Sequence, residues 1–252
     1  MKRFISPTGI GMFLLGASIA LGILLSSQTI SNAVVRMKQA NNIRVKGLAE
    51  EKIVSNHAAW LCEIRSKSGE LRQCFDELDR SKNAVQEYLK TAGVPDAAIS
   101  LKSIVTDYEY KLNEKGQKTN TLENYILTQV FEIRTSDVKL VDKVSKSVTE
   151  LIRNGIQISS FPPEYVNVEI EDIKMRLLAK ATANGYERAN ILARNSNGKV
   201  GLLNSASQGV FQITPLNSTD VSDSGQYDTS TIEKTVKAVV TLEFNVEGNS
   251  RN

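Results

Sequence analysis

Residues 231–246 read TIEKTVKAVVTLEFNV, and this stretch indicates the fold class most clearly. From Val236 onward every second position carries an apolar side chain, and the positions between them are mostly polar or charged. The apolar set is Val236, Ala238, Val240, Leu242, Phe244 and Val246. Because side chains alternate between the two faces of a strand, the pattern predicts a β-strand in a sheet with one covered face.

Further strands are predicted earlier in the chain. In residues 52–67, Ala58, Trp60, Cys62 and Ile64 alternate onto one face. Residues 99–113 and 125–135 read as a hairpin around a polar turn at Gly116. The other predicted strands cover residues 43–51, residues 156–168 with a break at Pro162–Pro163, and residues 200–214 with a polar interruption at 204–209.

Three amphipathic helices are predicted between the strands, over residues 70–92, 136–155 and 171–194, from apolar residues at three- and four-residue spacing. Ser136 is the expected N-cap of the second helix. Strands and helices mix without a regular βαβ order. The predicted class is therefore α+β, with mixed or antiparallel sheets packed by about three helices.

An apolar stretch, FISPTGIGMFLLGASIALGILL, runs from Phe4 to Leu25, and no charged residue occurs from Phe4 to Val35. A helix needs roughly 20 apolar residues to cross a bilayer. We therefore expect residues 1–27 to form one transmembrane helix that anchors the chain in the cytoplasmic membrane, followed by a polar spacer at 28–42. A cleaved secretory signal, cut near Ala33, remains open as the alternative.

The formal net charge is +3, and Lys2 and Arg3 supply two of these charges. No basic field is left to attract a nucleic acid, so none is expected as a partner. The Lys/Arg count hardly decides the orientation of the anchor. The very short N-terminal tail favours export of the large domain.

Two cysteines, Cys62 and Cys74, fall on the apolar sides of a predicted strand and the helix that follows it. If that helix packs on the strand, both thiols point into one interface. A disulfide between them would close a loop of roughly a dozen residues, worth on the order of 3 kcal/mol. A disulfide and two unpaired core thiols both remain open.

Residues with catalytic potential are few. His57 is the single histidine, so a Ser-His-Asp, Cys-His or zinc site would have to rely on it. Asp220, Asp223 and Asp228 lie in a Ser/Thr/Asp/Gly-rich insert at about 215–231 but lack the pattern of a calcium loop, so we interpret them as a solvated, mobile linker. We predict no catalytic, cofactor-binding or metal-binding residues, and the sequence does not identify a small-molecule ligand.

Several short motifs together resemble the bacterial SIMPL-domain proteins. The first is VKGLAE at residues 45–50, with Trp60 ten residues after Glu50. The landmarks that follow in order are Gly93, Thr106–Asp107, LIRNGI at 151–156, Ile173–Lys174, GKVG at 198–201, QGVFQI at 208–213 and the strand 236–244. The resemblance covers about residues 43–246, and we delimit the domain as 43–247 with a short tail at 248–252.

The resemblance implies an exported α+β domain of the bacterial envelope that often carries an N-terminal membrane helix. It also implies homo-oligomers in some relatives and a role in envelope or oxidative-stress tolerance, and it supplies no catalytic residues. Asn56 departs from the acidic residue that is usual in relatives. We expect a non-enzymatic, membrane-anchored envelope protein that acts by self-assembly or partner binding. A soluble periplasmic binding or stress protein is the alternative, and a hydrolase is the least favoured.

Overall fold

The structure is a computed structural model that describes residues 7–38, 42–218, 220 and 222–248, and within the first helix the side chains of residues 16–31. The helices are α1 (Pro7–Lys38), α2 (Leu71–Thr91), α3 (Val138–Ser147) and α4 (Ile170–Asn195), with short 3-10 helices η1 (Asp96–Ala98) and η2 (Val148–Asn154). The strands are β1 (Asn42–Val54), β2 (His57–Ser68), β3 (Ile99–Leu101), β4 (Val105–Leu112), β5 (Lys118–Thr135), β6 (Gln157–Ser160), β7 (Glu164–Val166), β8 (Gly198–Gln208), β9 (Gln212–Pro215), β10 (Gln226–Tyr227) and β11 (Glu233–Gly248). Helices and two mostly antiparallel sheets confirm the α+β class.

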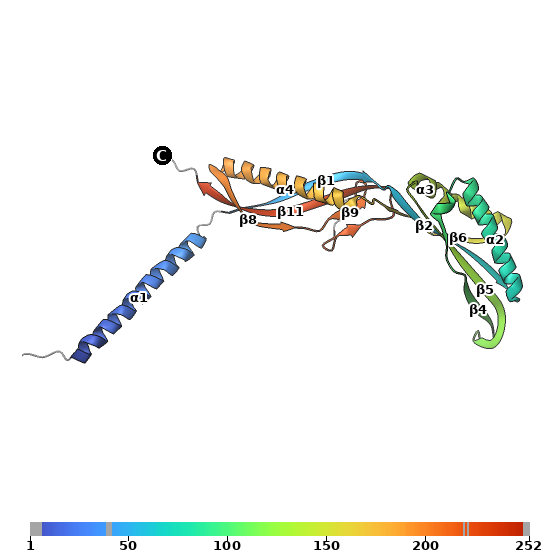
Figure 1. Cartoon of the computed structure of the whole chain (residues 1–252), viewed down its shortest axis with the longest axis horizontal. Coiled ribbons are helices and arrows are strands. Elements are labelled where there is room, and N and C mark those ends of the chain that lie inside the picture. The colour runs from blue at the N-terminus through green and yellow to red at the C-terminus, as the bar shows by residue number, and fades with distance from the viewer. Residues whose placement is uncertain (1–6, 39–41, 219, 221, 249–252) are drawn as a thin grey trace, which may run out of the picture. The chain divides into compact units, whose positions relative to one another are not determined.

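The chain divides into two compact units. Unit 1 comprises residues 1–47, 182–208 and 240–252, and unit 2 comprises residues 48–181 and 209–239. The stretch 43–247, expected as one domain, is therefore shared between them. The units are described separately below, and Figure 1 labels their elements.

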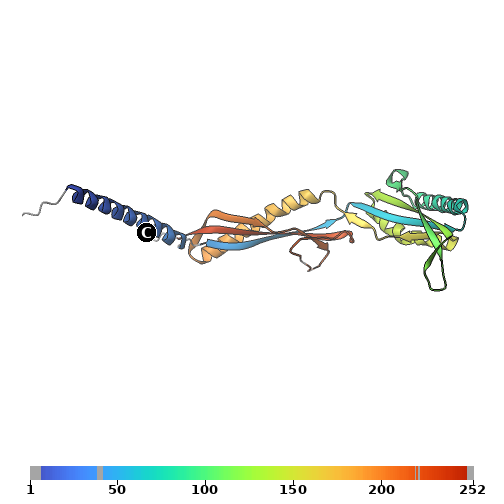
Figure 2. The same cartoon turned by 90° about the horizontal axis from the view of Figure 1, so that it is seen from below.

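Unit 2 contains a six-stranded antiparallel sheet in the order β3-β5-β2-β6, with β4 beside β5 and β7 beside β2. Both α2 and α3 pack on one face of this sheet (Figure 2). Trp60, Phe131 and Ile64 are at most 1% exposed and form the centre of the core with the apolar stripes of the two helices. The alternation of β2 predicted this buried face correctly.

Helix ends in unit 2 follow local sequence signals. Gly93 has φ +92° after α2, and Gly155 has φ +78° after η2, the left-handed conformation that glycine adopts without a steric penalty. The predicted cap of α3 was wrong by one residue. Asp137, not Ser136, is the N-cap, because its carboxylate accepts a hydrogen bond from the Leu140 amide at 2.9 Å.

Several predicted strands differ from the structure. The first strand runs on to Val54, so β2 begins at His57 rather than at residue 52, and the strand predicted from residue 125 begins at Lys118. The stretch 99–113 is two strands, because Lys102 leaves the ladder and its carbonyl accepts a hydrogen bond from Gln129 Nε2 at 3.1 Å. Conversely, β8 continues through the polar residues 204–208, since Ser205 and Ser207 pair with Glu243 and Thr241 of β11. Pairing with a neighbouring strand outweighs the low strand propensity of these residues.

In unit 1, α4 lies close to the sheet formed by β1, β11 and β8. A Cβ on Gly185 would lie 2.8 Å from Leu242 Cδ1 and 3.3 Å from Gly47 Cα, which confirms that small residues on this helix permit a close approach. Tyr186 packs edge-to-face on Phe244, with ring centroids 5.6 Å apart.

Helix α1 continues past Leu25 to Lys38, so most of the expected spacer at 28–42 is helical. Residues 26–38 contain no glycine or proline to end the helix. Among the described side chains of α1, at residues 16–31, six large apolar ones are exposed, namely Ile19, Leu21, Ile23, Leu24, Leu25 and Ile30. In the part of the chain that the structure describes, no helix is both long enough and apolar enough to cross a membrane.

Candidate functional site

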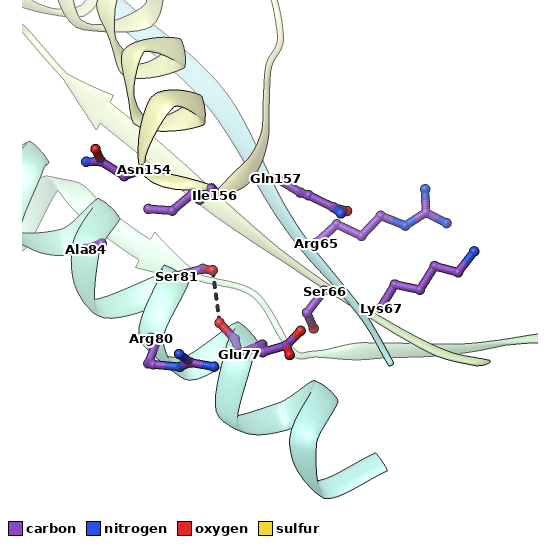
Figure 3. A pocket seen from close by; sticks show the side chains of 11 residues that line it. Arg65, Ser66, Lys67, Glu77, Arg80, Ser81, Ala84, Asn154, Ile156 and Gln157 are labelled. Carbon is purple, nitrogen blue, oxygen red and sulfur yellow. Dashed lines mark hydrogen bonds between the residues drawn. The ribbon is translucent and has the colours of Figure 1, made fainter. Parts of the chain in front are cut away.

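A polar pocket of about 420 Å³ lies beside the end of β2 in unit 2, and Figure 3 shows the side chains that line it. Residues 65–67 of β2 form one wall, and Glu77, Arg80, Ser81 and Ala84 of α2 form another. Residues 154–157, between η2 and β6, close the third side. The pocket forms here because the register of β6 with β2 ends at the pair Arg65–Gln157, while β2 runs on to Ser68.

The pocket carries three cationic side chains, Arg65, Lys67 and Arg80, and one carboxylate, Glu77. Lys67 pairs with Glu109 of β4 at 2.5 Å, and this hydrogen bond, the largest cause, holds the pKa of Glu109 below its usual value. Arg65 and Arg80 form no ion pair within the described chain, so the pocket keeps an excess of positive charge.

The hydroxyl groups of the pocket are engaged by the backbone. Ser81 Oγ donates to the Glu77 carbonyl at 2.9 Å (Figure 3), and Ser66 Oγ donates to the Cys74 carbonyl at 2.8 Å. The lining residues include no histidine or cysteine that could activate a hydroxyl group. The lining offers cationic and amide side chains that can bind a small polar ligand.

Cys62 and Cys74 are both fully buried in the core between the sheet and α2, as predicted, and both are free thiols. Cys74 Sγ donates to the Tyr125 carbonyl at 3.4 Å. Burial raises the pKa of Cys62 to about 12, so this thiol stays protonated and is a poor nucleophile.

His57 is exposed, and its Nδ1 lies 3.3 Å from Asn56 Oδ1. The same Asn56 oxygen accepts a hydrogen bond from the backbone amide of Val168 at 3.0 Å, and the backbone amide of Asn56 donates to the Val166 carbonyl. Asn56 therefore holds the turn between β1 and β2 against the segment after β7. The side-chain amide oxygen of Asn56 is the hydrogen-bond acceptor that the carboxylate of an acidic residue would supply at this position.

The prediction that Asp228 is solvated was wrong. Its side chain is 8% exposed and pairs at 3.2 Å with Lys234, whose side chain is 2% exposed. Ser230 donates to Asp228 Oδ1 through its amide at 2.9 Å and its hydroxyl at 2.7 Å, and Thr231 Oγ1 donates to Oδ2. Burial opposes ionisation of Asp228, but these hydrogen bonds outweigh it and lower its pKa.

Lys234 was overlooked although the sequence carries a signal for it. It occupies the same alternate positions of β11 as Val236 and Ala238, which places it on the buried face. Burial lowers the pKa of Lys234, while Asp228 opposes that shift. Asp220 and Asp223 are exposed, and no group of three or more potential metal ligands gathers among the described residues.

Strand β4 presents an exposed apolar edge. It pairs with β5 on one side, and no other described strand pairs with it. Val105, Tyr108 and Leu112 are 55–62% exposed. Tyr108 packs edge-to-face on Tyr125, with ring centroids 5.9 Å apart.

Comparison with known proteins gives a family for this fold. No curated protein matches the chain. A family model described as "SIMPL: Protein of unknown function (DUF541)" matches residues 43–244. This range includes the pocket, the β4 edge and the Asp228–Lys234 pair, and it extends over most of the chain. The chain therefore belongs to the SIMPL (DUF541) family.

Proposed function

We propose that this protein is a non-enzymatic envelope protein, anchored in the cytoplasmic membrane by α1, that acts by self-assembly or partner binding. The observation that carries the anchor is the apolar surface of α1. At 100° per residue, Leu21 and Leu24 share one side of the helix and Ile23 points about 160° away from Leu21, and each of the three is at least 60% exposed. A helix that is apolar on most sides is stable when lipid or protein surrounds it.

The length of α1 and the sequence around it support the same proposal. A helix of 32 residues is about 48 Å long, against roughly 30 Å for a hydrocarbon core. The uncharged stretch begins at Phe4 and is flanked by Lys2 and Arg3 before it and Arg36 and Lys38 after it.

Carbonate extraction of bacterial membranes tests the anchor. The wild-type protein should stay in the membrane pellet, and Leu21→Arg with Leu24→Arg should release it, since each central arginine costs about 2.5–3.5 kcal/mol. Ile191→Arg, at an exposed position of α4, is the matched control and should not change retention. A mature chain whose mass corresponds to a start at Val34 would instead establish the soluble periplasmic alternative.

Self-assembly is proposed through the β4 edge. An exposed strand edge offers unpaired amides and carbonyls to a second strand, and apolar side chains favour the contact. A second copy of the chain meets both requirements, because it carries the same edge and can pair with it by two-fold symmetry.

Light scattering after size-exclusion chromatography in detergent tests this assembly. Val105→Lys places a charge on the edge and should shift the protein toward monomer, whereas Val168→Lys, at 59% exposure away from the edge, should not. A monomeric wild-type protein at high concentration, or the same mass for both variants, would contradict the proposal.

The pocket beside β2 supports a second candidate function, the binding of a small anionic ligand. Its volume of about 420 Å³ falls in the range of small-molecule sites, and Arg65 and Arg80 supply charge. A thermal-shift screen of small phosphates and carboxylates should find a saturable ligand. Arg80→Gln should abolish the shift, and Arg72→Gln, on α2 outside the pocket, should preserve it.

A further inference from the structure

Four elements meet at one end of unit 1, which we call the α4–β8 end. It comprises residues 42–44 of β1, residues 190–203 from α4 into β8, and residues 243–248 of β11. Asn42 and Arg44 bond to Glu243, and Gly198 pairs with Gly248. A Cβ on Gly198 would lie 3.6 Å from the Ala193 carbonyl, so the end of α4 adjoins the same point.

A pocket of about 450 Å³ opens at this end. It is lined by Asn190, Arg194, Asn197, Gly198, Lys199 and Val200. The lining contains two cations, two amides and no carboxylate, which is a donor set suited to phosphate oxygens. Glu247 is the cross-strand partner of Lys199, and Arg44 is already paired with Glu243 at 2.7 Å.

The cations of this end gather at the pocket. Residues 42–44, 190–203 and 243–248 contain three Lys or Arg residues and two Glu residues, a net charge of +1. Two of the three cations, Arg194 and Lys199, line the pocket. Beside the pocket, Leu202 is 79% exposed, and Leu203 is 52% exposed.

The short connection between α1 and β1 limits how far the α4–β8 end can lie from the end of α1. Gln39, Ala40 and Asn41 separate Lys38, the last residue of α1, from Asn42 of β1. Four Cα–Cα steps reach at most about 14 Å. If α1 spans the membrane, which is the proposed function on which this inference rests, the start of β1 stays within that distance of the helix end.

We propose that the α4–β8 end docks on the anionic phospholipid surface of the membrane that α1 spans. Arg194 and Lys199 bind headgroup phosphates in the pocket, and Leu202 contacts the boundary between headgroups and acyl chains. The proximity imposed by the tether raises the local concentration of headgroups, so a shallow pocket is sufficient for binding. Each cation near an anionic surface changes the docking equilibrium about five-fold, so the pair accounts for about 25-fold.

The test uses the full-length chain with Leu202→Trp in nanodiscs that contain the same fraction of spin-labelled phosphatidylcholine as quencher. Trp60 is buried, and its signal is subtracted with the wild-type protein. We expect strong quenching in discs rich in phosphatidylglycerol and weak quenching in pure phosphatidylcholine. Arg194→Gln with Lys199→Gln should reduce the docked-to-undocked ratio about 25-fold. Lys139→Gln with Lys143→Gln, two exposed cations of α3, is the matched control and should preserve quenching.

The outcomes separate the two proposals. A protein that remains in the discs but is quenched equally in both lipids, or equally in the Arg194/Lys199 variant, overturns the docking inference and leaves the anchor intact. A protein that does not co-purify with the discs overturns the anchor, and the docking inference with it. The circular dichroism spectrum of each variant shows that a lost signal is not lost folding.

Discussion

The buried pair of Asp228 and Lys234 gives the sharpest prediction for stability. Asp228→Ala removes the partner of a lysine whose side chain is 2% exposed, together with the acceptor for Ser230 and Thr231. Removing one partner of a buried pair costs about 3–5 kcal/mol. Asp228→Ala should therefore lower the free energy of unfolding at pH 7 by an amount in this range.

The pH dependence of that loss follows from the lysine. In the folded variant, Lys234 must either lose its proton or stay charged in the core without a partner. Deprotonation of Lys234 at pH 7 costs about 4.6 kcal/mol, because the pKa of a lysine in the unfolded chain is about 10.4. This value is the upper limit of the cost of burying the lysine without its partner. At pH 9 the upper limit falls to about 1.9 kcal/mol. Because the unfolded state then binds more protons than the folded state, the stability of the variant rises with pH.

Urea unfolding, followed by the fluorescence of the buried Trp60, measures the free energy of unfolding at pH 7 and at pH 9. Asp228→Ala combined with Lys234→Met should recover most of the loss, since no buried charge remains. Glu171→Ala removes the 79% exposed partner of Lys174 and should leave the unfolding free energy unchanged. A loss below about 1 kcal/mol for Asp228→Ala, or an equal loss at pH 7 and pH 9, would refute the reasoning.

Three further predictions concern other parts of the fold. Gly185→Ala places a methyl group 2.8 Å from Leu242 and should cost about 1–3 kcal/mol in urea unfolding. Cys62, with a pKa raised to about 12 by burial, should not react with a thiol reagent at pH 8 before unfolding, and its share of the stability should decline as pH rises above about 8.5. Asn56→Ala removes the acceptor of the Val168 amide and should cost about 1–2 kcal/mol, whereas Asn56→Asp should retain most of the stability.

The parts of the fold that follow local rules could be predicted from the sequence. The alternation in β11, the apolar stripe of α2 and the glycines after α2 and η2 each depend on residues close in the chain. The buried face of β2 also follows from its period of two. These elements were predicted with the correct type, although β2 begins at His57 rather than at residue 52.

The errors come from partners that only the folded chain brings together. The break at Lys102 depends on Gln129 of β5, and the continuity of β8 depends on its register with β11. Asp228 was taken for a solvated residue because its neighbours in sequence are polar, yet Lys234 and two hydroxyl groups surround it. The pocket beside β2 could not be predicted, since it depends on where the pairing of β6 with β2 stops.

The way the chain is shared between the two units has a practical consequence. It crosses from one unit to the other within β1, within α4, between β8 and β9, and within β11. No contiguous stretch of the gene encodes either unit, so a truncation at the start of β11 removes a strand from both. A protease that nicks one crossing leaves the others intact, and the nicked protein should still migrate as one particle. Expression of either unit as an isolated fragment would require its separate segments to be joined directly to one another.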